Sequence, residues 1–110
     1  MRTLRFIVDR QIIKQDPECD FNNIVPGTVE YLKAEFSFSS EWDNTIKVAA
    51  FYRNGHECTP QVLKDGRSCI IPEEALINRR FEIMLIGKNK KLKIITNKIE
   101  VIQNLSLIHI

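Results

Sequence analysis

The chain has 110 residues, of which 44% are hydrophobic and 27% charged, and its formal net charge is +2. This length suits a single domain with one core, and no apolar run approaches the roughly 20 residues that span a bilayer. Because phosphate binding needs a concentrated basic face, the charge does not favour a nucleic-acid partner; we also expect no membrane contact and no secretory signal.

Alternating side chains predict strands from the start of the chain. Residues 2–9 form the first, and residues 11–15 either pair back on it or continue it past a bend. A turn at residues 16–18 leads into a polar loop over residues 19–28, which in so small a domain belongs on the rim. Residues 32–38 then alternate apolar and polar side chains, as a half-buried strand does.

A short polar segment that contains the single tryptophan follows this strand. A tryptophan in a short helical turn between two strands commonly closes the open end of a β domain. We therefore expect Trp42 to be a core plug rather than an exposed binding anchor, with Ser39 or Ser40 capping the turn. The residues to which we assign structural roles are Phe36, Trp42, Phe51 and Pro72.

Two turn signals punctuate the next stretch. A strand over residues 46–52 ends at Asn54-Gly55, the strongest short signal for a hairpin. A third strand leads to the turn Asp65-Gly66, and residues 67–71 are predicted to fold back on it before Pro72.

The three cysteines are an odd number, which argues against a disulfide framework. If residues 64–66 form a hairpin turn, Cys69 lies opposite residues 61–62, roughly 10 Å along the strand from Cys58, whereas bridging needs Cα atoms within about 7 Å. We expect Cys19, Cys58 and Cys69 to be free thiols in a reducing compartment.

The second half of the chain continues the β pattern. Residues 72–76 combine proline at a first helical position with two carboxylates, which predicts one helical turn over an edge of the domain. Residues 81–87 are apolar on both sides and suit a central strand. A charged turn at residues 88–91 precedes residues 92–96 and 98–102, which are two further strands or one long bent strand.

Seven or eight short strands with almost no helical periodicity predict an all-β fold. The economical architecture is an antiparallel β-sandwich, immunoglobulin-like or jelly-roll-like, with one or two short helical turns. One domain would cover residues 1–102. The apolar tail, residues 103–110, is a final edge strand, a segment that pairs with another copy, or residues foreign to the natural protein.

The residues closest to a chemical site are His56, Cys58 and Cys69. As zinc ligands they lack a fourth partner at a recognisable spacing. As a nucleophile pair they lack an identifiable orienting carboxylate and oxyanion hole. The four widely spaced glycines cannot build a phosphate loop. We therefore expect no catalytic residues, no metal, no cofactor and no enzymatic activity.

Exposed basic side chains and the apolar tail are the candidate contacts for a protein partner. In the lysine run at residues 88–93 no aromatic side chain interleaves to stack bases, so a solvated tip that discourages edge pairing is favoured over a nucleic-acid contact. The candidate protein-binding residues are Arg53, His56, Arg79, Arg80, Lys88, Lys90, Lys91, Lys93, Leu105 and Leu107.

Three short motifs occur together: Phe-Ser-x-x-Trp-Asp at residues 38–43, Lys-x-Ala-x-Phe at residues 47–51 and Ile-Pro at residues 71–72. With the strand at residues 81–87, they give the segment 32–96 a resemblance to a β-sandwich domain of phages and prophages of Gram-positive bacteria. The segment is similar to the N-terminal domain of upper baseplate proteins and to small phage structural proteins.

The resemblance implies a fold and a setting, with no active site to transfer. In the baseplate proteins this domain attaches its chain to the virion and a long receptor-binding region follows, whereas here few residues follow it. One hypothesis is a non-enzymatic virion component of the tail or baseplate, which binds itself or another virion protein. The alternative is an inhibitor or adaptor that blocks a host protein such as a defence nuclease. Both place the chain in the host bacterial cytoplasm, and the first also in the virion.

Overall fold

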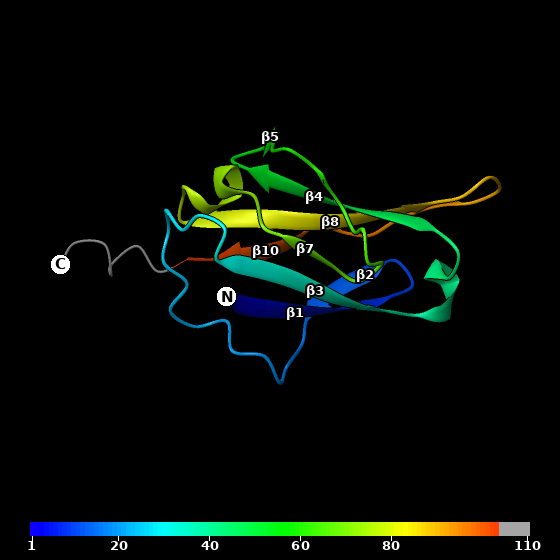
Figure 1. Cartoon of the computed structure of the whole chain (residues 1–110), viewed down its shortest axis with the longest axis horizontal. Helices are drawn as coiled ribbons and strands as arrows, with labels where there is room; N and C mark the ends of the chain where they lie inside the picture. Colours follow the sequence, from blue (N-terminus) through cyan, green and yellow to red (C-terminus); the bar gives the residue numbers. More distant parts are fainter. Residues whose placement is uncertain (104–110) are drawn as a thin grey trace.

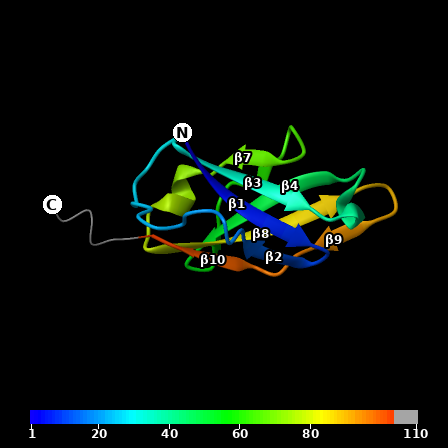
Figure 2. The same cartoon turned by 90° about the horizontal axis from the view of Figure 1, so that it is seen from below.

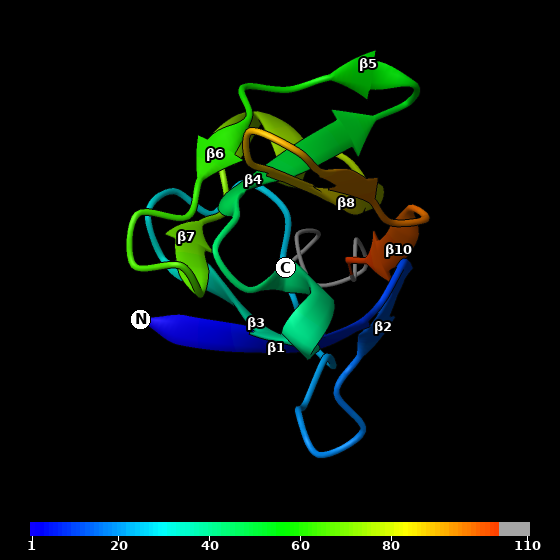
Figure 3. The same ribbon diagram turned by 90° about the vertical axis from the view of Figure 1, so that its right-hand side faces the viewer.

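The structure, a computed structural model, describes residues 1–103. Two β-sheets face each other across one hydrophobic core, as Figure 1 and the end-on view in Figure 3 show. The all-β prediction is confirmed. The elements of this part of the chain are β1 (Arg2–Asp9), β2 (Ile12–Gln15), β3 (Leu32–Phe38), η1 (Ser40–Trp42), β4 (Ile46–Arg53), β5 (His56–Glu57), β6 (Gln61–Val62), β7 (Ser68–Ile70), η2 (Glu73–Leu76), β8 (Arg80–Lys88), β9 (Lys93–Ile95) and β10 (Ile99–Ile102).

The first sheet, called sheet A, has the strand order β2-β1-β3-β7. The prediction of purely antiparallel pairing is wrong here, because β1 and β3 run parallel, from the pair Arg2–Leu32 to the pair Val8–Phe38. Parallel neighbours need a connection that crosses back over the sheet. Strand β2 and the loop over residues 16–31 provide this return.

The second sheet, called sheet B, has the order β10-β8-β4-β5, with β6 also pairing with β4 and β9 also pairing with β8. All its pairings are antiparallel. β8 lies between β4 and the β9/β10 edge, as predicted for a strand that is apolar on both sides. The β8–β9 hairpin extends beyond the end of sheet A (Figure 1).

The sequence predicted the fold of the region between Arg53 and Pro72 only in part. Asn54 and Gly55 have positive φ angles of 51° and 77°, which suit the tight hairpin between β4 and β5. The hairpin expected at Asp65-Gly66 is wrong, because β6 pairs with β4 in sheet B whereas β7 pairs with β3 in sheet A. The chain changes sheet at this turn.

The Asp65 carboxylate organises the turn between the two sheets. Its Oδ1 accepts hydrogen bonds from the backbone N–H groups of Arg67 (2.9 Å) and Ser68 (2.7 Å), and its Oδ2 accepts one from the Ser68 hydroxyl (2.6 Å). The hydroxyl bond and then the two backbone bonds hold the pKa of Asp65 well below its usual range.

Asp65→Asn should therefore destabilise the protein at neutral pH and matter little in acid. A carboxyl whose pKa is lowered by folding stabilises the fold above its unfolded pKa of about 4, and this contribution disappears as pH falls towards the folded pKa. We expect a loss of about 1 kcal/mol in the free energy of unfolding at pH near 7, because solvent screens so exposed a group. Urea titrations at neutral and acidic pH measure the loss in the free energy of unfolding, with Asp43→Asn as the control. An equal loss at both pH values would contradict the prediction.

Two short helices close the ends of the core. Trp42, fully buried in η1, donates a hydrogen bond from Nε1 to the Arg10 carbonyl (2.8 Å), and the core-plug prediction is confirmed. The capping prediction is wrong: neither helix has a side-chain cap, and the Ser39 hydroxyl instead accepts a bond from the Arg10 N–H. At the other end η2 buries Ala75 and Leu76.

The two sheets are also joined along one side, where β2 and β10 lie next to each other in Figures 2 and 3. The Asn97 N–H donates to the Gln11 carbonyl (3.1 Å), and the Asn97 side-chain oxygen accepts from the Ile13 N–H (2.9 Å). These bonds protect the edge of β2. In the described residues no helix is long and apolar enough to cross a membrane.

Candidate binding surface

Sheet B presents a broad outer face built in four columns. β4 and β8 are the central columns, and each outer column is divided between two short strands: β5 and β6 beside β4, and β9 and β10 beside β8. Side chains alternate along a strand, so Phe51, Ile83 and Leu85 point into the core and the residues between them point outward. The cross-strand register sorts these outward side chains into rows.

The row at the β8–β9 end, called the basic row, contains Lys64, Ile46, Lys88 and Lys93. Ile46 pairs with Lys88, and Lys88 pairs with Lys93. Lys64 follows Val62 by two residues and therefore lies on the same side of its column. All four side chains of the basic row are exposed.

The next row, called the apolar row, contains Val62, Val48, Ile86 and Ile95, one from each column. The pairs Val62–Val48, Val48–Ile86 and Ile86–Ile95 connect them directly. Val62 is 53% exposed and Ile95 37%, and the row joins them into one contiguous apolar patch. Val48 and Ile86 line an open groove of about 630 Å³ with Ile46 and Lys88 of the basic row. Its lining residues are Asn44, Ile46, Val48, Ile86, Lys88, Asn89 and Lys90.

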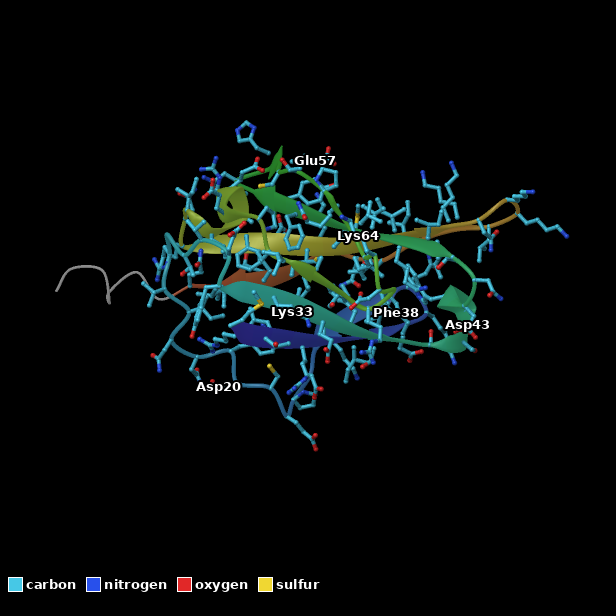
Figure 4. All side chains as sticks on the ribbon, in the orientation of Figure 1. Asp20, Lys33, Phe38, Asp43, Glu57 and Lys64 are labelled. Carbon is cyan, nitrogen blue, oxygen red and sulfur yellow. The ribbon has the colours of Figure 1, made fainter. Side chains whose placement is uncertain are left out.

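A third row, called the acidic row, crosses the other end of the face. It contains Glu57, Tyr52, Glu82 and Glu100, joined by the pairs Tyr52–Glu57, Tyr52–Glu82 and Glu82–Glu100. Burial and then the charge of Glu57 raise the pKa of the Tyr52 hydroxyl. Figure 4 shows Glu57 on the side of sheet B that faces away from sheet A.

The outer face of sheet A has a different character. Arg5 and Glu35 form an ion pair there (3.5 Å), and Ile7 lies between Lys14 and Ser37 in neighbouring strands. Charges of both signs alternate with single apolar side chains, as on an ordinary solvated surface. The segregated rows of sheet B therefore make its outer face the stronger candidate for binding.

The structure separates the basic residues that the sequence analysis grouped. Lys88, Lys90, Lys91 and Lys93 lie at the β8–β9 tip, whereas Arg80 begins β8 roughly 26 Å away along the strand. Arg80 forms an ion pair there with Glu100 (3.4 Å).

The remaining candidates lie near the start of β8. Arg79 and Arg80 line a shallow pocket of about 300 Å³ with Asn54, which belongs to the hairpin that also carries Arg53 and His56. Leu105 and Leu107 lie outside the described residues.

The geometry around His56, Cys58 and Cys69 does not assemble a nucleophile. His56 is exposed on β5, Cys58 is buried beside it, and Cys69 belongs to the other sheet. All three cysteines are free. Burial is the main cause that raises the pKa of Cys58, and it raises the pKa of Cys69 to about 12, so both thiols stay protonated at neutral pH. Among residues 1–103, no three His, Cys, Asp or Glu side chains gather as a metal site.

Sequence reasoning missed the apolar and acidic rows because their members are far apart in the chain. Val48 and Val62 belong to one row, as do Glu57 and Glu100, only through strand register. One available signal was the second apolar side of β8, formed by Met84 and Ile86, which the core does not need.

The candidate surface is thus identified from the strand register, side-chain exposure and charge of the described residues. Comparison with known proteins assigns no family: no protein-family model, no curated protein and no solved structure matches the chain.

Proposed function

We propose that the chain is a non-enzymatic protein-binding domain that uses the outer face of sheet B. The observation that supports this most is the apolar row, where four side chains from four columns form one strip next to lysines. Exposed apolar patches bordered by polar side chains are typical of protein contacts. The two layers around one core also support a β-sandwich type of fold, with the parallel pair β1/β3 as a departure.

We place this domain in a phage or prophage, as a small virion component of the tail or baseplate. The motifs behind this assignment have structural roles that suit a shared fold. Trp42 closes one end of the core, and Pro72 precedes the helix that closes the other. A virion component works through stoichiometric contacts with its neighbours, for which an apolar strip on a rigid sheet is well suited.

The proposal is tested by measuring how much of the chain enters particles. Ile86→Glu places a charge in the middle of the apolar row, where it would be desolvated on binding, so we expect at least a tenfold drop in incorporation. Quantitative mass spectrometry of purified virions, from cells that carry the wild-type or variant gene, gives the readout. Circular dichroism of the purified variant shows whether it folds.

Ile7→Glu is the matched control, because Ile7 is a half-exposed isoleucine on the outer face of sheet A. It should enter particles as the wild type does. Absence of the wild-type chain from virions would contradict the virion role.

A second candidate function is an inhibitor that binds a host protein, and the lysine tip favours it. Lys88, Lys90, Lys91 and Lys93 are all exposed at the end of a projecting hairpin, where they suit a partner with an acidic surface. If this function is correct, the particle experiment should find the wild-type chain absent from virions. The chain should instead be recovered in a one-to-one complex with a host protein, and Ile86→Glu should weaken that complex.

A further inference from the structure

The three rows on the outer face of sheet B follow a simple order. From the β8–β9 end to the opposite end the face is basic, then apolar, then a row with buried Ala50 and half-buried Met84 at its centre and Lys98 at its side, then acidic. Six residues along β8 separate Lys88 in the basic row from Glu82 in the acidic row, a distance of roughly 20 Å. The face therefore carries opposite charge at its two ends and apolar side chains between them.

We propose that this face binds the same face of a second copy, with the two sheets stacked and their strands antiparallel. The proposal builds on the protein-binding role given above and names the partner. A two-fold axis that runs along the rows reverses the order of the rows and keeps each column over its own counterpart. The basic row of one copy then lies over the acidic row of the other, and the apolar row lies over the row that contains Met84.

The match holds column by column. Lys88 meets Glu82, because both belong to β8. Lys93 of β9 meets Glu100 of β10, because both strands occupy the column beside β8. The same operation brings Lys64 over Glu57 in the outer column beside β4.

The remaining column, that of β4, completes the match with an apolar pair. Ile46 and Tyr52 both belong to β4 and are brought together at the ends of the face. Every basic side chain of one row thus meets a carboxylate, and the only apolar member of the basic row meets the only aromatic member of the acidic row.

Other stackings of two copies do not give this match. With parallel strands, lysines would lie over lysines and glutamates over glutamates, which is unfavourable at any separation. Arg80 already neutralises Glu100 in part, and Lys98 lies on the Tyr52 ring with Nζ 3.9 Å from its centroid. Glu57 and Glu82 therefore make the larger electrostatic contribution.

The size of the face sets the expected strength. Four columns about 4.8 Å apart and a length of roughly 20 Å give about 400 Å² for each copy, or about 800 Å² in total. This lies below the 1,200 Å² or so typical of stable complexes, so the dimer should be weak, with a dissociation constant in the micromolar range or above. Such an interface forms at the high local concentration of an assembly.

A charge-swap experiment tests the antiparallel arrangement. One variant carries Lys88→Glu with Lys93→Glu, and the other carries Glu82→Lys with Glu100→Lys. Each alone places like charges together in the proposed dimer, so we expect its association to weaken at least tenfold relative to the wild type. In an equimolar mixture the changed rows face each other with opposite charge, and association should return to within a few-fold of the wild type. Sedimentation velocity from micromolar to millimolar concentration measures each case.

Three further variants guard against misfolding and against general charge effects. Lys64→Glu and Glu57→Lys change the other outer column at exposed positions, and their mixture should show the same recovery. Lys14→Glu with Lys33→Glu reverses two lysines on the outer face of sheet A and should leave association unchanged.

Two results would overturn the proposal: a wild-type chain that is monomeric throughout the range, or a wild-type dimer whose charge-swapped variants do not recover on mixing. These are separable from failure of the proposed function. A monomeric chain that still needs Ile86 to enter particles would refute only the second copy as partner. A dimer with the expected charge-swap behaviour that is absent from particles would refute only the virion role.

Discussion

Trp42→Ala should lower the free energy of unfolding by about 3–5 kcal/mol, because it removes a large, fully buried ring and leaves a cavity. The Trp42 ring packs against Phe38, with ring centroids 5.2 Å apart. The substitution also removes the Nε1 donor that bonds the Arg10 carbonyl. Since small domains are typically stable by only about 5–15 kcal/mol, this loss removes a large share of the stability of the fold.

A urea titration monitored by far-ultraviolet circular dichroism measures this loss. Tryptophan fluorescence cannot monitor the variant, because the chain has one tryptophan and the substitution removes it. In the wild type, that same indole should move to longer emission wavelength on unfolding, as a ring does when it passes from a dry core to water. Tyr31→Ala is a suitable control, since Tyr31 is 50% exposed and its removal should change stability by less than about 1 kcal/mol. Equal losses in the two variants would contradict the role of Trp42 as a plug.

Sequence patterns predicted the long strands and the plug for the same physical reason. In β3 and β8 one side of the strand enters the core, so apolar residues recur every second position and the strand is visible without knowledge of its partners. Trp42 was predictable because its flanking polar residues permit a turn while its size requires burial.

Strand partners were harder to predict, because alternation reports burial and not pairing. The pattern in β1 and β3 is the same whether they run parallel or antiparallel, and only the long return loop distinguishes the two cases. Likewise, an Asp-Gly turn serves a hairpin and a change of sheet equally well. Since β6 has only two residues, its pairing with β4 left little trace in the sequence.

The candidate surface shows the same limit at the level of charge. Lysines that are close together in the chain were recognised as a group, and they do lie together at the β8–β9 tip. Glu57, Glu82 and Glu100 are far apart in sequence, so their common row exists only after folding. Arg79 and Arg80, which precede the lysines by few residues, lie at the opposite end because an extended strand carries them away.

Gly87→Ala should destabilise the protein by about 1–3 kcal/mol, because the core cannot accept even one additional carbon at this position. A Cβ atom built on Gly87 would lie 2.7 Å from both Cε3 and Cζ3 of Trp42 and 3.1 Å from Cγ2 of Ile94. The obstructing atoms belong to a rigid ring in the closed end of the core, so they cannot move aside as the end of a flexible side chain would.

The cause can be isolated by repeating Gly87→Ala in the Trp42→Ala background. Without the indole the clash is gone, the new methyl group fills part of the cavity, and alanine is preferred over glycine in a strand by roughly 0.5–1 kcal/mol. The same substitution should therefore become neutral or stabilising, which corresponds to a coupling energy of about 1–4 kcal/mol between the two positions. Chemical denaturation of the four proteins in this cycle measures the coupling. If Gly87→Ala were equally destabilising in both backgrounds, the requirement for glycine would come from the strand itself and not from the ring that packs on it.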